Sequence, residues 1–278
     1  MLSTVFSTDV GNGAPAGAVL LILDAGMQNL PWESLPSLRL QRIYRMPSLA
    51  CAAALAKRQR REGGFQKPGR RSIAEKGAGQ GNFQGLRVAN LRNTFFILNP
   101  DGDLTTRQSE FKEWFGAQAD WEFKGTAGRA PTPLEVERAL QHNDMFFYLG
   151  HGSGSKHLKS KQVAGLECRA VGMAMGCSSG RLKDQGAYEP AGHVLNYILA
   201  GSPVVVSNLW AVSEGDIWRF SQSCLKAMKE SMEPLCVAGA VSESRSACHL
   251  RHLVGAAPVC WGIPTAVAGF SGDWRAER

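Results

Sequence analysis

Five short apolar runs recur along this sequence, and segments with helical spacing lie between them. Runs of this length that are apolar at nearly every position indicate strands buried on both faces. The runs cover residues 18–23, 94–98, 145–149, 170–175 and 204–207. Helices are expected over residues 47–56, 105–115, 134–141, 191–200 and 214–229. This alternation predicts an α/β fold in which a mostly parallel central sheet carries helices on both faces. Residues 257–267 are expected either to close the sheet or to lie across it.

The length and composition suit a single folded domain. The chain has 278 residues, of which 44% are hydrophobic and 20% charged, and this is a globular composition. We expect a flexible N-terminus over residues 1–17 and one domain over residues 18–278. No apolar run approaches the roughly 18 residues of a membrane span, so no membrane association is expected. The run at 18–23 has no basic segment before it, which favours a strand over a signal peptide.

The positive charge is concentrated in one segment. The chain carries a net charge of +7, and residues 57–92 alone carry ten basic and two acidic residues. The segment is also rich in glycine, so it is expected to be a basic surface loop that interrupts the domain. The remainder of the chain is close to neutral. Direct nucleic-acid binding by the folded domain is therefore not expected.

The cysteines argue against a disulfide framework. There are seven of them, at wide spacings and without a CxxC pair. An odd count without paired spacing also argues against a zinc ribbon, so we expect a reducing compartment and no metal. One thiol is then free to be reactive.

A histidine and a cysteine follow two of the expected strands. His151 lies in the sequence Gly-His-Gly after residues 145–149, and Cys177 lies in Gly-Cys-Ser-Ser-Gly after residues 170–175. If these strands are adjacent and parallel, both side chains emerge at one sheet edge, as a Cys–His nucleophilic pair requires. The backbone N–H groups of Gly152 and Cys177 are candidates for an oxyanion hole. The alternatives are a small core cysteine and a turn histidine, whereas metal binding lacks a third ligand.

The motifs around this pair resemble the separase family of caspase-like cysteine endopeptidases. The resemblance rests on YLGHGSG, MGCSSG and the run from Gly192 through NYILAGSPVVVSNLW to GDIWRFS. It extends to LPWESLPSL, RMPSL, FFILNPDGDL, EFKEWF, GRAPTPLE and PVCWGIPTAV, which together cover roughly residues 18–267.

This resemblance implies a caspase-type fold and a catalytic dyad of His151 and Cys177. The residues themselves imply no metal or organic cofactor. It also implies cleavage of a cohesin kleisin subunit after arginine, which releases sister chromatids at anaphase. A securin-like inhibitor and a location in the nucleus and cytoplasm follow from the same resemblance.

Two features depart from the family pattern. Separases usually carry an acidic residue directly after the Asn-Leu-Trp tripeptide, where this chain has Ala211. Glu214 and Asp216 remain as candidates to bind a substrate arginine, although acidic residues in the first turn of a helix also complement its dipole. The second departure is length, because separases usually carry a long helical-repeat region before the protease. The sequence is therefore expected to be a fragment, a divergent short form or an incomplete gene model.

Two other functions compete with a separase-type peptidase. A non-catalytic separase-like module would bind substrate or inhibitor without turnover. A caspase-like protease would cleave a different substrate and have no mitotic role. The complete histidine and cysteine motifs favour an enzyme, and a peptide library would separate the two proteases by their preference for arginine.

Overall fold

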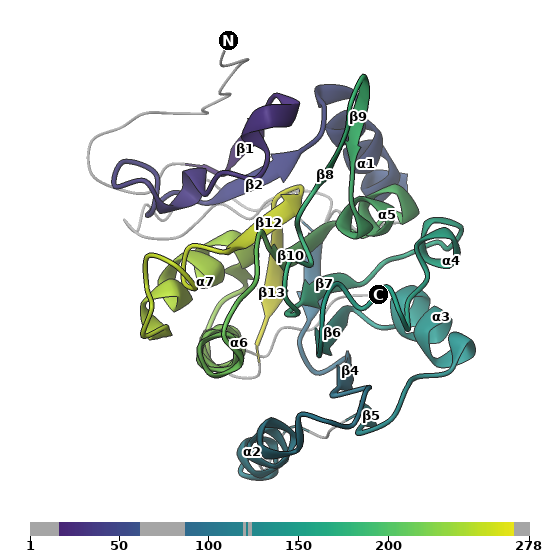
Figure 1. Ribbon diagram of the computed structural model, residues 1–278, viewed down its shortest axis with the longest axis vertical. Coiled ribbons are helices and arrows are strands. Elements are labelled where there is room, and N and C mark those ends of the chain that lie inside the picture. Colours follow the sequence, from purple (N-terminus) through teal and green to yellow (C-terminus); the bar gives the residue numbers. More distant parts are fainter. Residues whose placement is uncertain (1–16, 62–86, 119–120, 122–123, 270–278) are drawn as a thin grey trace, which may run out of the picture.

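The computed structural model describes residues 17–61, 87–118, 121 and 124–269, and its centre is an eight-stranded sheet (Figure 1). Five of its strands coincide with the apolar runs of the sequence, whose prediction as strands is confirmed. In spatial order the strands are β1 (Val19–Ile22), β2 (Ile43–Met46), β12 (Pro258–Gly262), β10 (Val204–Asn208), β7 (Val171–Ala174), β6 (Met145–Leu149), β4 (Thr94–Leu98) and β5 (Gly125–Ala127).

Six of the seven neighbouring strand pairs are parallel. Strands β10, β7, β6, β4 and β5 all run in one direction, and β12 pairs antiparallel with β10. Strands β2 and β1 continue the sheet parallel to β12. The carboxyl ends of β4, β6, β7 and β10 consequently meet at one edge, which is where parallel sheets usually bind ligands.

Helices cover both faces of this sheet (Figure 1). On one face, Phe96 and Phe147 of the sheet share a buried cluster with Phe111 and Phe220 from α2 (Thr105–Gly116) and α6 (Glu214–Glu230). On this face also lie α7 (Val237–Ser244) and a small sheet of β11 (Leu235–Cys236), β13 (Thr265–Ala268) and β3 (Arg87–Asn90).

The opposite face carries the remaining α-helices. Ile97 and Phe146 point into a second buried cluster with residues of α1 (Leu49–Arg61), α3 (Pro133–His142), α4 (Ser160–Ala164) and α5 (His193–Ala200). The alternation between Phe146 and Phe147 shows that one strand supplies both cores. The expected α/β fold is thus confirmed. Short elements complete the described chain: a hairpin of β8 (Lys183–Gln185) and β9 (Tyr188–Ala191), and the 3-10 turns Ala25–Met27, Trp32–Ser34 and Arg245–Ala247.

The start of α3 shows how local sequence sets an element boundary. Thr132 accepts a hydrogen bond from the backbone N–H of Glu135, and the Glu135 side chain accepts one from the backbone N–H of Thr132. Pro133 occupies the first turn, where its missing N–H costs nothing. The helix leads directly into β6, and thereby fixes where the strand before His151 begins.

Several boundaries differ from those expected. Strand β2 was not predicted, because its Arg45 made the segment look polar; this arginine is fully buried against Glu33. Helix α1 continues through residue 61, and residues 87–90 form β3, so both ends of the expected basic loop at 57–92 are regular structure. Its central part, 62–86, and the N-terminal residues 1–16 lie outside the described residues.

The C-terminal segment enters the sheet rather than closing it at an edge. Strand β12 lies between β2 and β10, and β13 belongs to the small sheet. Within the described ranges, we find no helix with the length and apolar character needed to cross a membrane.

Candidate functional site

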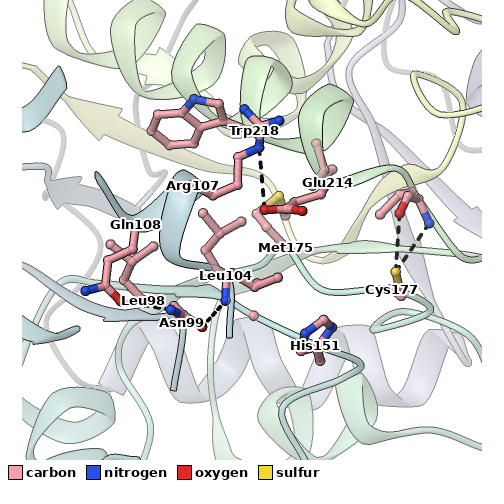
Figure 2. Close-up of a pocket in the computed structure, with 14 residues that line it drawn as sticks. Leu98, Asn99, Leu104, Arg107, Gln108, His151, Met175, Cys177, Glu214 and Trp218 are labelled. Carbon is pink, nitrogen blue, oxygen red and sulfur yellow. Dashed lines mark hydrogen bonds and ion pairs between the residues drawn. The ribbon is translucent and has the colours of Figure 1, made fainter. Parts of the chain in front are cut away.

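The sequence-predicted histidine and cysteine lie at the same edge of the sheet. His151 follows β6 and Cys177 follows β7, and these two strands are adjacent and parallel. Both side chains line a pocket of about 140 Å³ (Figure 2). The fold therefore brings the two candidates into one cavity.

The turn that carries Cys177 is held rigidly to the end of β10. The Ser179 hydroxyl donates to the carbonyl of Ala174 at 2.6 Å and accepts from the N–H of Asn208 at 3.0 Å. The Asn208 side-chain amide donates to the carbonyl of Gly176 at 3.1 Å. Ser179 and Gly176 thus help to fix the turn that carries Cys177.

The thiol of Cys177 contacts the backbone of Val212. Cys177 Sγ donates to the Val212 carbonyl at 3.4 Å and accepts from the Val212 N–H at 3.5 Å (Figure 2). The N–H contact would stabilise a thiolate, which is the nucleophilic form of cysteine. The carbonyl contact holds the protonated thiol at rest.

The imidazole of His151 contacts a carboxylate. His151 Nε2 lies 3.0 Å from Asp103 Oδ2, and both side chains are about half exposed. Because a carboxylate only accepts, this contact places the ring proton on Nε2 and leaves Nδ1 as the free acceptor. The Tyr148 hydroxyl also donates to the His151 carbonyl at 2.7 Å and fixes the loop.

Asp103 was not predicted as a site residue. The signal that could have found it is its position, since it follows strand 94–98, whose carboxyl end lies at the same edge of the sheet as the histidine. Forty-eight residues separate Asp103 from His151, so their contact was not readable from spacing.

Within the described residues, no hydrogen bond joins His151 to Cys177. The N–H groups of Gly152 and Cys177 likewise donate to no acceptor in the ranges that the structure describes. Gly152 adopts a left-handed conformation with φ of 58°, which suits glycine. Both candidate oxyanion donors are therefore available to a ligand.

The two acidic candidates, Glu214 and Asp216, differ in their position relative to the pocket. Glu214 lines the pocket, where its carboxylate lies 3.4 Å from Arg107 Nε (Figure 2). Asp216 does not line it and is 1% exposed. It binds Arg219 at 2.5 Å and accepts from the N–H groups of His249 and Leu250 at 2.8 and 3.0 Å.

The carboxyl of Asp216 is therefore part of the scaffold. Burial raises its pKa, but the Arg219 guanidinium and the two N–H groups outweigh burial and lower the pKa to about 2. Asp216 was expected as a second contact for a substrate arginine, but in this structure its acceptors are already engaged away from the pocket.

The walls of the pocket are largely apolar. Leu98, Leu104, Met175, Ile217 and Trp218 line it, together with the ionisable side chains of Arg107 and Glu214. A pocket with apolar walls and a few charged groups suits a long side chain whose end is polar. In the described part of the chain, no three His, Cys, Asp or Glu side chains cluster as a metal ion would require.

Comparison with known proteins places this chain in a family. The family model "Separin, protease domain" matches residues 6–217, which is most of the chain. The chain belongs to the separin family. The mouse protein named Separin is 34% identical over 249 residues and 90% of this chain, and the Schizosaccharomyces pombe Separin is 37% identical over 254 residues and 89% of this chain.

Solved separase structures share the fold. A crystal structure of the Saccharomyces cerevisiae separase–securin complex superimposes with a TM-score of 0.76 at 32% identity, covering 91% of this chain and 16% of that chain. Among the curated separins, this chain spans only 11% of the mouse protein and 13% of the S. pombe protein. The similarity therefore concerns the protease domain of much longer proteins.

Proposed function

We propose that this chain is a separase-type cysteine endopeptidase that uses His151 and Cys177 as its dyad. The observation that carries the proposal is the shared pocket, which the side chains of His151 and Cys177 both line. The N–H groups of Gly152 and Cys177 belong to the same two turns and donate to no acceptor among the described residues. The pocket lies at the sheet edge where parallel strands end, which is the common location of catalytic groups in this class of fold.

In the proposed reaction, His151 accepts the Cys177 proton on Nδ1, and Asp103 holds the ring through Nε2. The thiolate attacks the scissile carbonyl, whose oxygen accepts from the N–H groups of Gly152 and Cys177. The amine leaves with the proton from His151, and a thioester remains. Water then hydrolyses the thioester with His151 as the base. Cys177 must leave the Val212 carbonyl before it attacks.

Glu214 is our candidate for recognising the residue before the cleaved bond. It is the acidic side chain of the pocket, and apolar walls lead to it. A long basic side chain would place its alkyl part against Leu104 and Met175 and its cation on Glu214. An arginine at this position is therefore the substrate class we propose, even though Ala211 replaces the family's usual acid.

The biological assignment rests on the family. We infer a cohesin kleisin subunit as the substrate, with sister-chromatid release as the outcome, in the nucleus and cytoplasm. A securin-like inhibitor is inferred because the superimposed yeast structure is named as a separase–securin complex.

An arginine-ended peptide acyloxymethyl ketone tests the chemistry. We expect it to label Cys177 in the wild-type chain, much more slowly in His151→Ala, and not at all in Cys177→Ser. The matched probe with glutamine in place of arginine should label Cys177 less than the arginine probe does. In Glu214→Gln, the difference in labelling between the two probes should be smaller. Half-buried Cys51 serves as an internal reference for nonspecific alkylation.

The possible failures have different meanings. Labelling that ignores the residue before the ketone would retain the peptidase and reject the arginine pocket. A folded protein that is not labelled would support a non-catalytic binding module, in which the Cys177 thiol stays in contact with the Val212 carbonyl.

A further inference from the structure

The carboxylate proposed to bind substrate already has a partner within the chain. Arg107 of α2 lines the same pocket, and its Nε lies 3.4 Å from Glu214 Oε1. The contact bridges α2 and the first turn of α6 across the cavity (Figure 2). A Cβ placed on Gly215 would lie 3.7 Å from Arg107 Nη2, so the guanidinium reaches the beginning of α6.

Arg107 also has a second partner outside the pocket. Its Nη1 lies 2.5 Å from Glu110 Oε2, one helical turn along α2. Glu110 is not among the pocket-lining residues. Arg107 can consequently release Glu214 and keep its ionic contact with Glu110. The free-energy cost of replacing Arg107 at Glu214 by another cation is therefore small.

We propose that Arg107 is a specificity-determining residue that competes with the substrate's basic side chain for Glu214. The inference rests on the proposed peptidase function and on Glu214 as the site of the substrate cation. When a substrate arginine enters, Arg107 stays on Glu110 and the incoming guanidinium takes Glu214. While Arg107 holds Glu214, the pocket is close to neutral and accepts uncharged long side chains as well.

The physical consequence is weaker binding of basic substrates without loss of chemistry. In the described part of the chain, no hydrogen bond or ion pair joins Arg107 to His151 or Cys177, so we expect its removal to leave the reacting groups in place. Its charge repels a substrate cation and occupies the carboxylate that would bind it. Removing it should therefore act mainly on KM for basic peptides, which should fall, rather than on kcat.

Kinetics on paired peptides give the first test. Fluorogenic peptides that end in arginine or in glutamine are compared on wild-type protein, Arg107→Gln, Glu214→Gln and the double variant. We expect Arg107→Gln to lower KM for the arginine peptide about two- to fivefold, the range measured for exposed ion pairs. KM for the glutamine peptide should not fall, and the gain for the arginine peptide should vanish in the double variant.

Lys226→Gln is the matched control. Lys226 is an exposed cation on α6, paired with Glu230 at 4.0 Å and about 18 Å along the helix from Glu214. The control removes the same charge from the protein, so an effect shared by both variants would reflect net charge alone and would overturn the proposal.

Binding without turnover separates this inference from the peptidase function. The fluorescent arginine peptide is titrated by anisotropy into Cys177→Ser and into Cys177→Ser/Arg107→Gln. Tighter binding by two- to fivefold in the second supports competition even if no hydrolysis is found. An unchanged or weaker affinity overturns it, because Arg107 would then be neutral or would hold Glu214 in its binding position.

Discussion

Gly176 and Gly152 are in direct contact across the two turns that carry the candidate dyad. A Cβ placed on Gly176 would lie 1.8 Å from the Gly152 carbonyl oxygen and 2.8 Å from that of Gly150. The turn before Cys177 therefore packs on the backbone on either side of His151. Only glycine permits this close approach, so we expect the contact to influence how far apart the two candidate side chains lie.

We expect Gly176→Ala to separate the two turns. The added methyl group meets backbone rather than a movable side chain, so the variant should lose about 1–3 kcal/mol of stability. The rate of Cys177 alkylation by the arginine probe should fall at least tenfold in protein that remains folded. Urea unfolding and labelling kinetics measure the two effects.

Gly116→Ala is the control for this change. Gly116 ends α2, and a Cβ there would meet nothing within 4 Å. Alanine is the better helix former, so this variant should be as stable as the wild type or slightly more stable. Equal labelling of Gly176→Ala and the wild type would show that the contact does not set the site geometry.

A second prediction concerns Asp103, which holds the Nε2 side of His151 at 3.0 Å. Asp103→Ala removes the group that selects the tautomer with Nδ1 free, so kcat should fall while KM changes little. We expect roughly a tenfold loss, because the pair is half exposed and screened by solvent. Asp103→Asn should preserve the orientation of the His151 ring only in part. Its kcat should lie between that of the wild type and that of Asp103→Ala.

The control for Asp103 is Asp101 on the same loop, which pairs with Lys156 and His157 instead. Asp101→Asn changes the loop charge equally and leaves the His151 contact intact. A kcat loss of the same size in both variants would assign the effect to the loop rather than to the imidazole.

The sequence predicts the strands that are apolar throughout, but it predicts neither strand β2 nor the order of strands in the sheet. Apolar runs identify β4, β6, β7 and β10 because burial on both faces demands them. Strand β2 escapes detection because buried Arg45 is neutralised by Glu33, which only the folded chain brings to it. The position of β12 inside the sheet depends on long-range pairing that local pattern does not encode.

The same limit applies to the site. His151 and Cys177 are recognisable because each follows an apolar run and has glycine beside it. Asp216 could not be separated from Glu214, since both occupy the first turn of α6. Their difference arises from the loop at residues 249–250, whose N–H groups engage only Asp216.

The seven cysteines should differ strongly in reactivity. Cys51 and Cys177 are half-buried, and the other five are buried. Burial raises the pKa of the thiols of Cys168 and Cys224 to about 12 and that of Cys248 to about 11, which removes their thiolate form at neutral pH. Brief iodoacetamide treatment followed by peptide mass mapping should modify Cys51 and Cys177 first.

The comparison between these two thiols tests the dyad. His151→Ala should slow modification of Cys177 and leave that of Cys51 unchanged, because only Cys177 shares a pocket with the imidazole. Early modification of the buried cysteines would indicate an opened fold, and equal slowing at both thiols would assign the effect to something other than His151.

His193 should make the fold sensitive to mild acid. Its Nδ1 lies 2.9 Å from the Ser160 hydroxyl, its ring packs edge-on against Tyr197, and burial lowers its pKa to about 4. As the pH falls, His193 therefore binds a proton near pH 6.5 in the unfolded chain but only near pH 4 in the folded chain. The stability linked to this histidine is complete above pH 6.5 and declines as the pH falls toward 4.

His193→Phe should remove that pH dependence while keeping the aromatic contact with Tyr197. Between pH 6.5 and 4, the free energy of unfolding of the wild type should fall more steeply than that of the variant, by up to about 1.4 kcal/mol per pH unit. Urea unfolding at each pH measures both slopes. His142→Phe is the control, because His142 at the end of α3 has no such buried contact with Tyr197 or Ser160. Parallel slopes for the wild type and His193→Phe would show that the imidazole is protonated in the folded state as readily as in the unfolded chain.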